Sequence, residues 1–217
     1  MIIKKFLHSC VLLEENGKRL LIDPGIFSFI EKKVTPEDIG PVDGILLTHE
    51  HPDHYAPEII KQFMVLNPTT TLATHEGIGK LLQVEGLPYR NMSAGGTMDV
   101  AGFIVQALEA PHGAIPFPAP QNLAYHMNTR FLHPGDSLTT ADGIHCDVLA
   151  LPIAGPWLKL VDTLAWAKQV KPRIAIPIHD VFIKDFFLDR MYQMCAKILT
   201  DAGIEFRPLN IGESLEV

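Results

Sequence analysis

The segment that most constrains this protein is Thr48-His49-Glu50-His51-Pro52-Asp53-His54. Three histidines and one aspartate that could bind a metal fall within its last six residues. They come directly after the apolar run from Gly44 to Thr48, and this run predicts a buried strand. Pro52 disfavours a helix here, so we expect an irregular loop whose ligands converge from several directions. Histidine and carboxylate suit zinc, manganese or iron. The segment therefore predicts a metal site at the end of a strand, held by His49, His51, Asp53 and His54.

Strand and helix patterns alternate along the rest of the chain. Asn16-Gly17 predicts a hairpin turn between strands at Phe6–Leu13 and Arg19–Ile22. Further short apolar runs predict strands at 71–73, 103–107, 123–127, 130–132, 148–151 and 174–178. Helical spacing or capping predicts helices from Thr35-Pro36 and over 56–66, 78–84, 160–170 and 183–199, with extended structure returning at 204–208. Periodicity alone supports an α/β or α+β fold, and the architecture we expect is a four-layer αββα sandwich of two mixed sheets.

Length and composition favour one globular domain over residues 1–217. The net charge of −7 comes without a run of Lys or Arg, which weighs against nucleic acid and an anionic membrane as partners. No apolar stretch approaches the length of a membrane span, and Glu14 and Glu15 come too early for a signal peptide. We therefore expect a cytoplasmic protein with a small-molecule substrate, and a homo-oligomer is compatible with the sequence.

Three separated cysteines, Cys10, Cys146 and Cys195, form no C-x-x-C pair and are expected to be buried thiols. H-E-x-x-H is absent, since Asp53 stands three residues after Glu50, which excludes the zincin pattern. The G-x-S-x-G nucleophile motif is absent as well. A metal-activated water therefore fits this chain better than a serine or cysteine nucleophile.

The segment from His49 to His54 resembles the H-x-H-x-D-H signature of the metallo-β-lactamase superfamily, and the resemblance extends over nearly the whole chain. In that family two further histidines and a bridging aspartate complete two metal sites. They correspond here to His112 in Ala110-Pro111-His112-Gly113, to Asp136 in Pro134-Gly135-Asp136-Ser137 and to His179 in Pro177-Ile178-His179-Asp180. The resemblance implies a first metal on His49, His51 and His112, and a second on Asp53, His54 and His179, with Asp136 between them. Glu50 replaces the usual glycine between the first two histidines.

Two residues are expected to support this site. Asp23, in Leu21-Ile22-Asp23-Pro24-Gly25, resembles the family aspartate that hydrogen-bonds the metal loop, although it could also be only a strand-end turn residue. His8, in His8-Ser9-Cys10, is open between a turn residue and a polar group of the site. Within the superfamily, this tripeptide and the Ile-Pro-Ile-His ending at 179 are similar to the L-ascorbate-6-phosphate lactonase branch.

The resemblance implies a hydrolase that uses a hydroxide bridging two divalent ions. Zn²⁺ is the first expectation, with Mn²⁺ or Fe²⁺ as alternatives, and Asp53 would orient the hydroxide as the catalytic carboxylate. The substrate we expect is a small ester, lactone or amide of anionic character. A small-molecule phosphodiesterase and a non-hydrolytic metal-binding or redox protein stay open as alternatives, because one metal site serves many chemistries.

The loop after His112 holds three prolines in Gly113–Pro120, so it is expected to form a stiff apolar wall beside the metals. Phe117 of this loop and Trp157 on the opposite side are the predicted substrate contacts, with ordinary core packing as the alternative for both. Four other histidines match no trusted family position and are interpreted as structural: His75, His126, His133 and His145.

Overall fold

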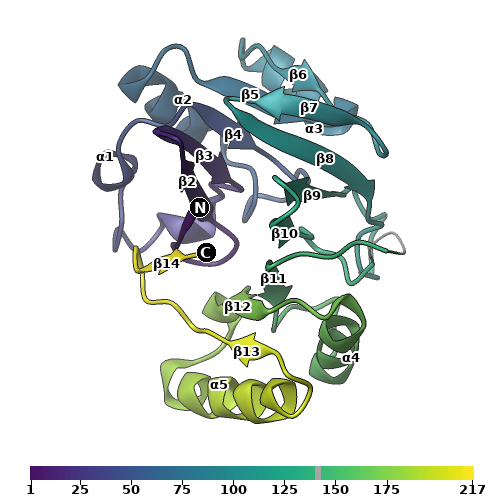
Figure 1. The fold of residues 1–217 in the computed structure, drawn as a ribbon. Helices are drawn as coiled ribbons and strands as arrows, with labels where there is room; N and C mark the ends of the chain where they lie inside the picture. Colours follow the sequence, from purple (N-terminus) through teal and green to yellow (C-terminus); the bar gives the residue numbers. More distant parts are fainter. Residues whose placement is uncertain (140–142) are drawn as a thin grey trace.

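The computed structural model describes residues 1–139 and 143–217, and its strands form two mixed sheets (Figure 1). In order across the sheet, the first contains β14 (Ser214–Glu216), β1 (Ile2–Lys5), β2 (Val11–Glu15), β3 (Lys18–Ile22), β4 (Gly44–Leu46), β5 (Thr71–Thr74) and β6 (Arg90–Asn91). The second contains β13 (Glu205–Phe206), β12 (Ile174–Ile178), β11 (Val148–Pro152), β10 (Phe131–His133), β9 (Leu123–Met127), β8 (Phe103–Glu109) and β7 (Thr97–Val100). In each sheet the pairs are antiparallel at one end and parallel at the other.

Helices lie outside both sheets, as Figure 1 shows for α4 and α5 beside the second sheet. The helices are α1 (Pro36–Ile39), α2 (Pro57–Leu66), α3 (Glu76–Val84), α4 (Leu160–Val170) and α5 (Asp185–Thr200), with single 3₁₀ turns η1 (Ile26–Ser28) and η2 (Asp180–Phe182). The segments predicted as helices all form, with ends shifted by a few residues. None of the helices in the described ranges is long and apolar enough to cross a membrane.

The buried apolar residues form three clusters, one between the two sheets and one between each sheet and the helices outside it, and these clusters separate four layers. Successive side chains of β3 point to opposite faces of the sheet. Ile22 therefore packs between the two sheets, while Leu21 packs toward the helices outside the first sheet. Phe63 of α2 belongs to the same cluster as Leu21. On the outer face of the second sheet, Leu149 of β11 packs in one cluster with Leu199 of α5. The αββα sandwich expected from the sequence is therefore confirmed.

The hairpin turn is also confirmed, because Asn16 and Gly17 both have positive φ, 51° and 72°, as a type I′ turn requires. The prediction of one strand over Phe6–Leu13 is wrong. The chain loops between Phe6, whose amide donates to the carbonyl of Cys10, and Val11, where β2 begins. This loop contains His8, and the extra strand β1 precedes it.

Strands β1, β6, β7 and β14 were not predicted from the sequence. β7 and β8 form a hairpin around Ala101 and Gly102, which both have positive φ. β6 and β14 are only two and three residues long, so period-2 alternation cannot identify them. β1 and β14 pair across nearly the full length of the chain, which places the two termini side by side (Figure 1).

Candidate metal centre

The candidate ligands follow the ends of strands in both sheets. In the first sheet, Asp23 follows β3, and His49 comes soon after the parallel strand β4. In the second sheet, His112 comes after β8, Asp136 after β10 and His179 directly after β12. Parallel strands end at the same edge of a sheet, where loops can bring distant residues together. The two sheets therefore deliver ligands from separate parts of the chain to one place.

These side chains form two groups, in each of which the ligand atoms lie within 4.8 Å of one another. The first group consists of His49, His51, His112 and Asp136. The second group consists of His8, Asp53, His54 and His179. The structure thus brings together all seven residues predicted as ligands, and it adds His8 as an eighth member of the clusters.

Asp136 lies between the two groups and turns one carboxylate oxygen toward each. Its Oδ2 is 3.5 Å from Nε2 of His112 and 3.9 Å from Nε2 of His49. Its Oδ1 is 2.9 Å from Nε2 of His54 and also 2.9 Å from Nε2 of His179. A carboxylate in this position can bind two cations at once, one through each oxygen.

The ligand atoms of the two groups are arranged to bind metal ions and leave several of their own hydrogen bonds unmade. Among the described residues, the buried atoms that make no hydrogen bond include Nε2 of His54, His112 and His179, and Oδ1 of Asp136. Nε2 of His49 lies 3.1 Å from Nδ1 of His51. Two nitrogens on one tetrahedral zinc would be roughly 3.3 Å apart, from bonds of about 2.0–2.1 Å. The nitrogen, carboxylate and spacing pattern therefore suits divalent ions.

Metal binding needs neutral imidazoles and ionised carboxylates, and His49 and Asp53 meet this need without a metal. Burial, followed by the neighbouring His54, holds the pKa of His49 well below its ordinary value. Burial alone would raise the pKa of Asp53, but the hydrogen bond from His8 and the nearby His54 lower it to about 2. Burial opposes the charged form of His54, yet Asp136 and Asp23 raise the pKa of that imidazole well above its ordinary value. Without a metal, His54 is therefore protonated between two carboxylates, and a metal ion would take the place of its proton.

Asp23 supports the metal loop, as predicted for the family aspartate. It is fully buried and accepts hydrogen bonds from the backbone N–H and the hydroxyl of Thr48, at 2.8 and 2.6 Å. Its Oδ2 lies 2.7 Å from Nδ1 of His54. Gly25, two residues after Asp23, packs so closely against the metal loop that a Cβ there would overlap the carbonyl group of Asp53. The segment Asp23–Gly25 therefore holds the metal loop in position by hydrogen bonds and close packing.

His8 has a position that sequence alone left open. Its Nε2 lies 2.9 Å from Oδ2 of Asp53, and its side chain is fully buried. Burial, followed by the neighbouring His179, lowers the pKa of His8 to about 4. His8 has φ 59° and His179 has φ 65°, conformations that are uncommon for residues other than glycine and that often occur at functional sites.

Asn122 is a supporting residue that no sequence pattern identified. Its amide group donates to the carbonyls of Ala110 and Pro134, at 2.8 and 3.0 Å, and its oxygen accepts from the backbone N–H of Asp136 at 3.2 Å. It thereby joins the loop of His112 to the loop of Asp136. No spacing or motif identifies an asparagine that acts by connecting two loops.

A cavity of about 230 Å³ opens beside the ligands. Trp157 lines it, with its ring 6.0 Å from the rings of both His112 and His179. The prediction that Phe117 contacts this space is wrong, because a bend at residues 116–117 leaves that side chain 75% exposed. Ile115 of the same loop lines the cavity in its place. The remaining lining residues are Phe27, His51, Asp53, His112, Asp136, Pro156 and Phe182.

The four histidines interpreted as structural belong to neither cluster of the described residues. His133 joins two loops, since its Nε2 lies 3.0 Å from the carbonyl of Ser9 and its Nδ1 accepts from the N–H of Gly135. His75 caps the N-terminus of α3 by accepting from the N–H of Gly77. His126 is buried in β9, and His145 is exposed.

Comparison with known proteins agrees with this geometry. Residues 2–179 match the family model described as Beta-lactamase superfamily domain. Protein Rv0786c of Mycobacterium tuberculosis is 33% identical over 190 residues, which cover 84% of this chain and 85% of that protein. The UPF0173 metal-dependent hydrolase Ta0764 of Thermoplasma acidophilum is 31% identical over 185 residues, 79% of this chain and 80% of that one. Igni18, a metallo hydrolase from Ignicoccus hospitalis, shares the fold, with a TM-score of 0.77 at 21% identity over 100% of this chain and 98% of that one.

Proposed function

This chain belongs to the metallo-β-lactamase superfamily and is a metal-dependent hydrolase, and from that premise we propose that it cleaves a small ester, lactone or amide with two divalent ions. The observation that carries the proposal is the position of Asp136, which turns Oδ2 to His49 and His112 and Oδ1 to His54 and His179. His49, His51 and His112 would hold one ion, and Asp53, His54 and His179 the other. Zn²⁺ is the ion we expect, with Mn²⁺ or Fe²⁺ as alternatives.

When bound here, two divalent ions supply a water whose pKa falls toward about 7 and a Lewis acid for the developing oxyanion. Asp53 would orient that water by accepting a hydrogen bond from it. Its pKa of about 2 favours this orienting role over carrying a proton to the leaving group. His8 would hold Asp53 in position through the 2.9 Å contact of its Nε2.

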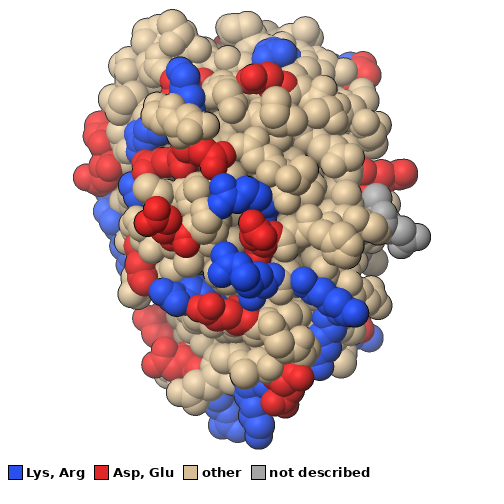
Figure 2. All heavy atoms as spheres, in the orientation of Figure 1, with Lys and Arg blue, Asp and Glu red and all other residues tan. Residues whose placement is uncertain are grey.

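The walls of the site support a small substrate. Trp157 and Ile115 line a cavity of only about 230 Å³, which limits the group that can reach the ligands. Acidic and basic side chains are interspersed on the face shown in Figure 2, and the chain has a net charge of −7. A long polyanion would therefore find no continuous basic surface on that face, whereas a small anionic group would be attracted by the ions. The lactone-cleaving branch stays a prediction.

The experiment combines metal content with a substrate panel. Protein reconstituted separately with zinc and manganese is analysed for metal and assayed on lactones, phenyl acetate, bis(p-nitrophenyl) phosphate and a structured RNA. We expect two ions per chain and turnover of lactones or esters. A ceiling of one ion per chain would contradict the dinuclear site. Turnover of the phosphodiester alone would favour the phosphodiesterase alternative, and rapid RNA cleavage would contradict the small-substrate assignment.

A further inference from the structure

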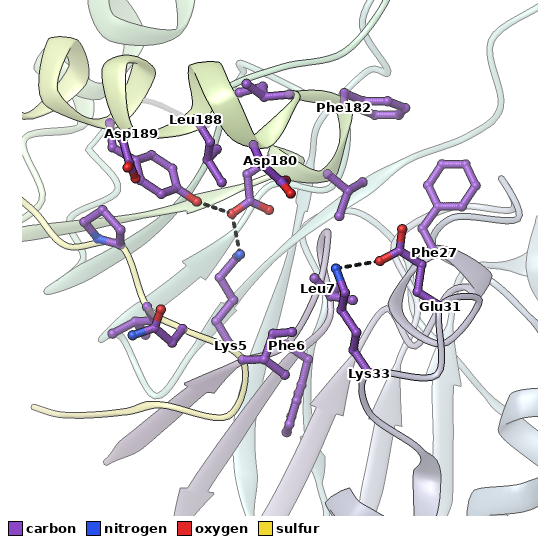
Figure 3. Close-up of a pocket in the computed structure, with 18 of the residues that line it drawn as sticks. Lys5, Phe6, Leu7, Phe27, Glu31, Lys33, Asp180, Phe182, Leu188 and Asp189 are labelled. Atoms are coloured by element: carbon purple, nitrogen blue, oxygen red, sulfur yellow. Dashed lines mark hydrogen bonds and ion pairs between the residues drawn. The ribbon is translucent and has the colours of Figure 1, made fainter.

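A second and larger cavity, of about 720 Å³, adjoins the candidate metal centre (Figure 3). Phe27 and Phe182 line both cavities, and their rings meet edge to face with centroids 5.9 Å apart. The two cavities therefore share this aromatic pair as a common wall. Because the cavity at the metal ligands is only about 230 Å³, most of the room for a ligand lies on the far side of the pair.

The walls of the larger cavity combine apolar and charged side chains, and the cavity is partly open to solvent. Phe6, Leu188 and Leu209 line it, and Ile30 and Ile211, which are 61% and 41% exposed, also line it. Large apolar side chains left exposed around a concave space are typical of ligand-binding sites. An apolar group bound here would remove that surface from water.

The floor of the cavity holds a buried carboxylate that is only half satisfied. Oδ2 of Asp180 accepts hydrogen bonds from Nζ of Lys5 and from the hydroxyl of Tyr192, each at 2.6 Å. Burial and the neighbouring Asp180 raise the pKa of Tyr192, so its hydroxyl stays a donor. Oδ1 of Asp180 has no hydrogen-bond partner, although the residue is only 6% exposed. An unpaired buried carboxylate oxygen is unfavourable, which calls for a donor from a ligand.

The charges around the cavity select the kind of donor. Lys5 and Lys33 line it together with four acidic residues, Glu31, Asp180, Asp185 and Asp189. The Lys33 ammonium is paired with Glu31 and the Lys5 ammonium with Asp180 (Figure 3), and these pairs leave Asp185 and Asp189 in excess. This balance favours a cation or a neutral donor and disfavours an anion.

We propose that the larger cavity binds an apolar arm of the substrate, and that this arm carries an ammonium or other hydrogen-bond donor for Oδ1 of Asp180. The hydrolysed group would lie at the metal ligands, and the arm would cross the edges of Phe27 and Phe182, the wall that the two cavities share. This inference rests on the proposed function, because it assigns both cavities to one substrate. It adds that the substrate is bipartite, with its scissile group and its donor at opposite ends of an apolar linker.

A binding experiment tests the cavity independently of turnover. Titration calorimetry on the metal-loaded protein compares phenylbutylamine, phenylbutanol and phenylbutyl methyl ether, whose end groups are a charged donor, a neutral donor and no donor. We expect the amine to bind about tenfold more tightly than the ether, with the alcohol between them. Equal affinities for the three compounds would overturn the role of Asp180.

Ile211→Trp should fill the cavity from its rim, because Ile211 is partly exposed there and its replacement does not disturb the core. The matched control is Val84→Trp, which adds the same side chain at an 85% exposed position of α3 that does not line the cavity. Phenylbutylamine should bind about tenfold more weakly to Ile211→Trp and equally well to Val84→Trp. Equal binding to both variants would place the ligand elsewhere.

Turnover then separates this inference from the proposed function. The phenyl ester of ω-aminooctanoic acid reaches both cavities, whereas phenyl acetate has no arm. Ile211→Trp should lower kcat/KM for the long ester about tenfold more than for phenyl acetate. If the wild type hydrolyses neither these esters nor the lactones of the panel, the proposed function fails while the amine titration still decides the cavity. Equal losses for both esters would overturn the substrate arm. It would also be overturned if sedimentation showed a dimer that Ile211→Trp dissociates and that the amine does not affect.

Discussion

The carboxylate of Asp23 lies 2.7 Å from Nδ1 of His54, and both side chains are fully buried. The same carboxylate accepts the backbone N–H of Thr48, so one residue at the end of β3 holds both ends of the metal loop. With Nδ1 of His54 engaged, its Nε2 is turned toward Asp136, 2.9 Å away. A partner of this kind fixes the orientation of a ligating imidazole.

Asp23→Ala should therefore weaken metal binding even though Asp23 is not itself a proposed ligand. We expect affinity to fall about 10- to 100-fold, as measured by competition with a chelator. Loss of the acceptor for Thr48 should also lower the free energy of unfolding by about 1–3 kcal/mol. Asp201→Ala, at an exposed position after α5, is the control. Unchanged chelator competition in Asp23→Ala would contradict a supporting role.

Asp136→Ala should lose both ions, because its two oxygens face different clusters. His145→Ala should keep both, since His145 is exposed and belongs to neither cluster. Elemental analysis of the two variants, together with turnover of the best small substrate, measures the difference. A second ion retained at full occupancy in Asp136→Ala would show that the carboxylate does not bridge.

The metal-free protein should lose stability as the pH falls from about 6.5 toward 4. Burial is the main reason that the pKa of His8 falls to about 4. Burial also lowers the pKa of five further histidines, which are His49, His51, His75, His126 and His133. The unfolded chain, with values of about 6.5, then binds more protons in this range, so acid favours unfolding. His54 acts in the opposite direction, because its pKa is raised and it is charged in the fold.

Urea unfolding of chelator-treated protein at about pH 7.5 and about pH 5 measures this loss. The midpoint should be lower at the more acidic pH. His126→Gln removes one buried imidazole outside both clusters, so its midpoint should change less between the two conditions. A midpoint that stays constant or rises on acidification would contradict the assignment.

The cysteines should be unreactive in the folded protein. All three are buried, and burial raises the pKa of Cys146 to about 12 and that of Cys195 to about 11. Ellman's reagent at about pH 8 should therefore label no thiol rapidly, because the thiolate is the reactive form. Three thiols should react after unfolding in guanidinium. Rapid labelling of the native chain would show an accessible thiolate.

The ligands that follow strand ends could be predicted from the sequence because their signals are local. His49, His51, Asp53 and His54 lie within one loop, and Pro52 marks that loop as irregular. His112, Asp136 and His179 carry weaker local signals, and resemblance to a family supplied them. The residues that line the approach to the site were harder to predict. Phe117 had the expected chemistry, but a bend in its loop turns it to solvent.

The sequence by itself determined the alternation of strands and helices, the hairpin turn at Asn16-Gly17 and the residues able to bind metal, since each depends on side chains close together in the chain. Only the tertiary structure decided that His8 meets Asp53, that Asn122 joins two loops, and that Phe27 and Phe182 separate two cavities. These contacts join segments that are distant in the chain, within one sheet for His8 and Asn122 and across the two sheets for Phe27 and Phe182, and their partners are set by how the sheets form and pack. No local spacing encodes that packing, because it depends on the burial of all three apolar clusters at once.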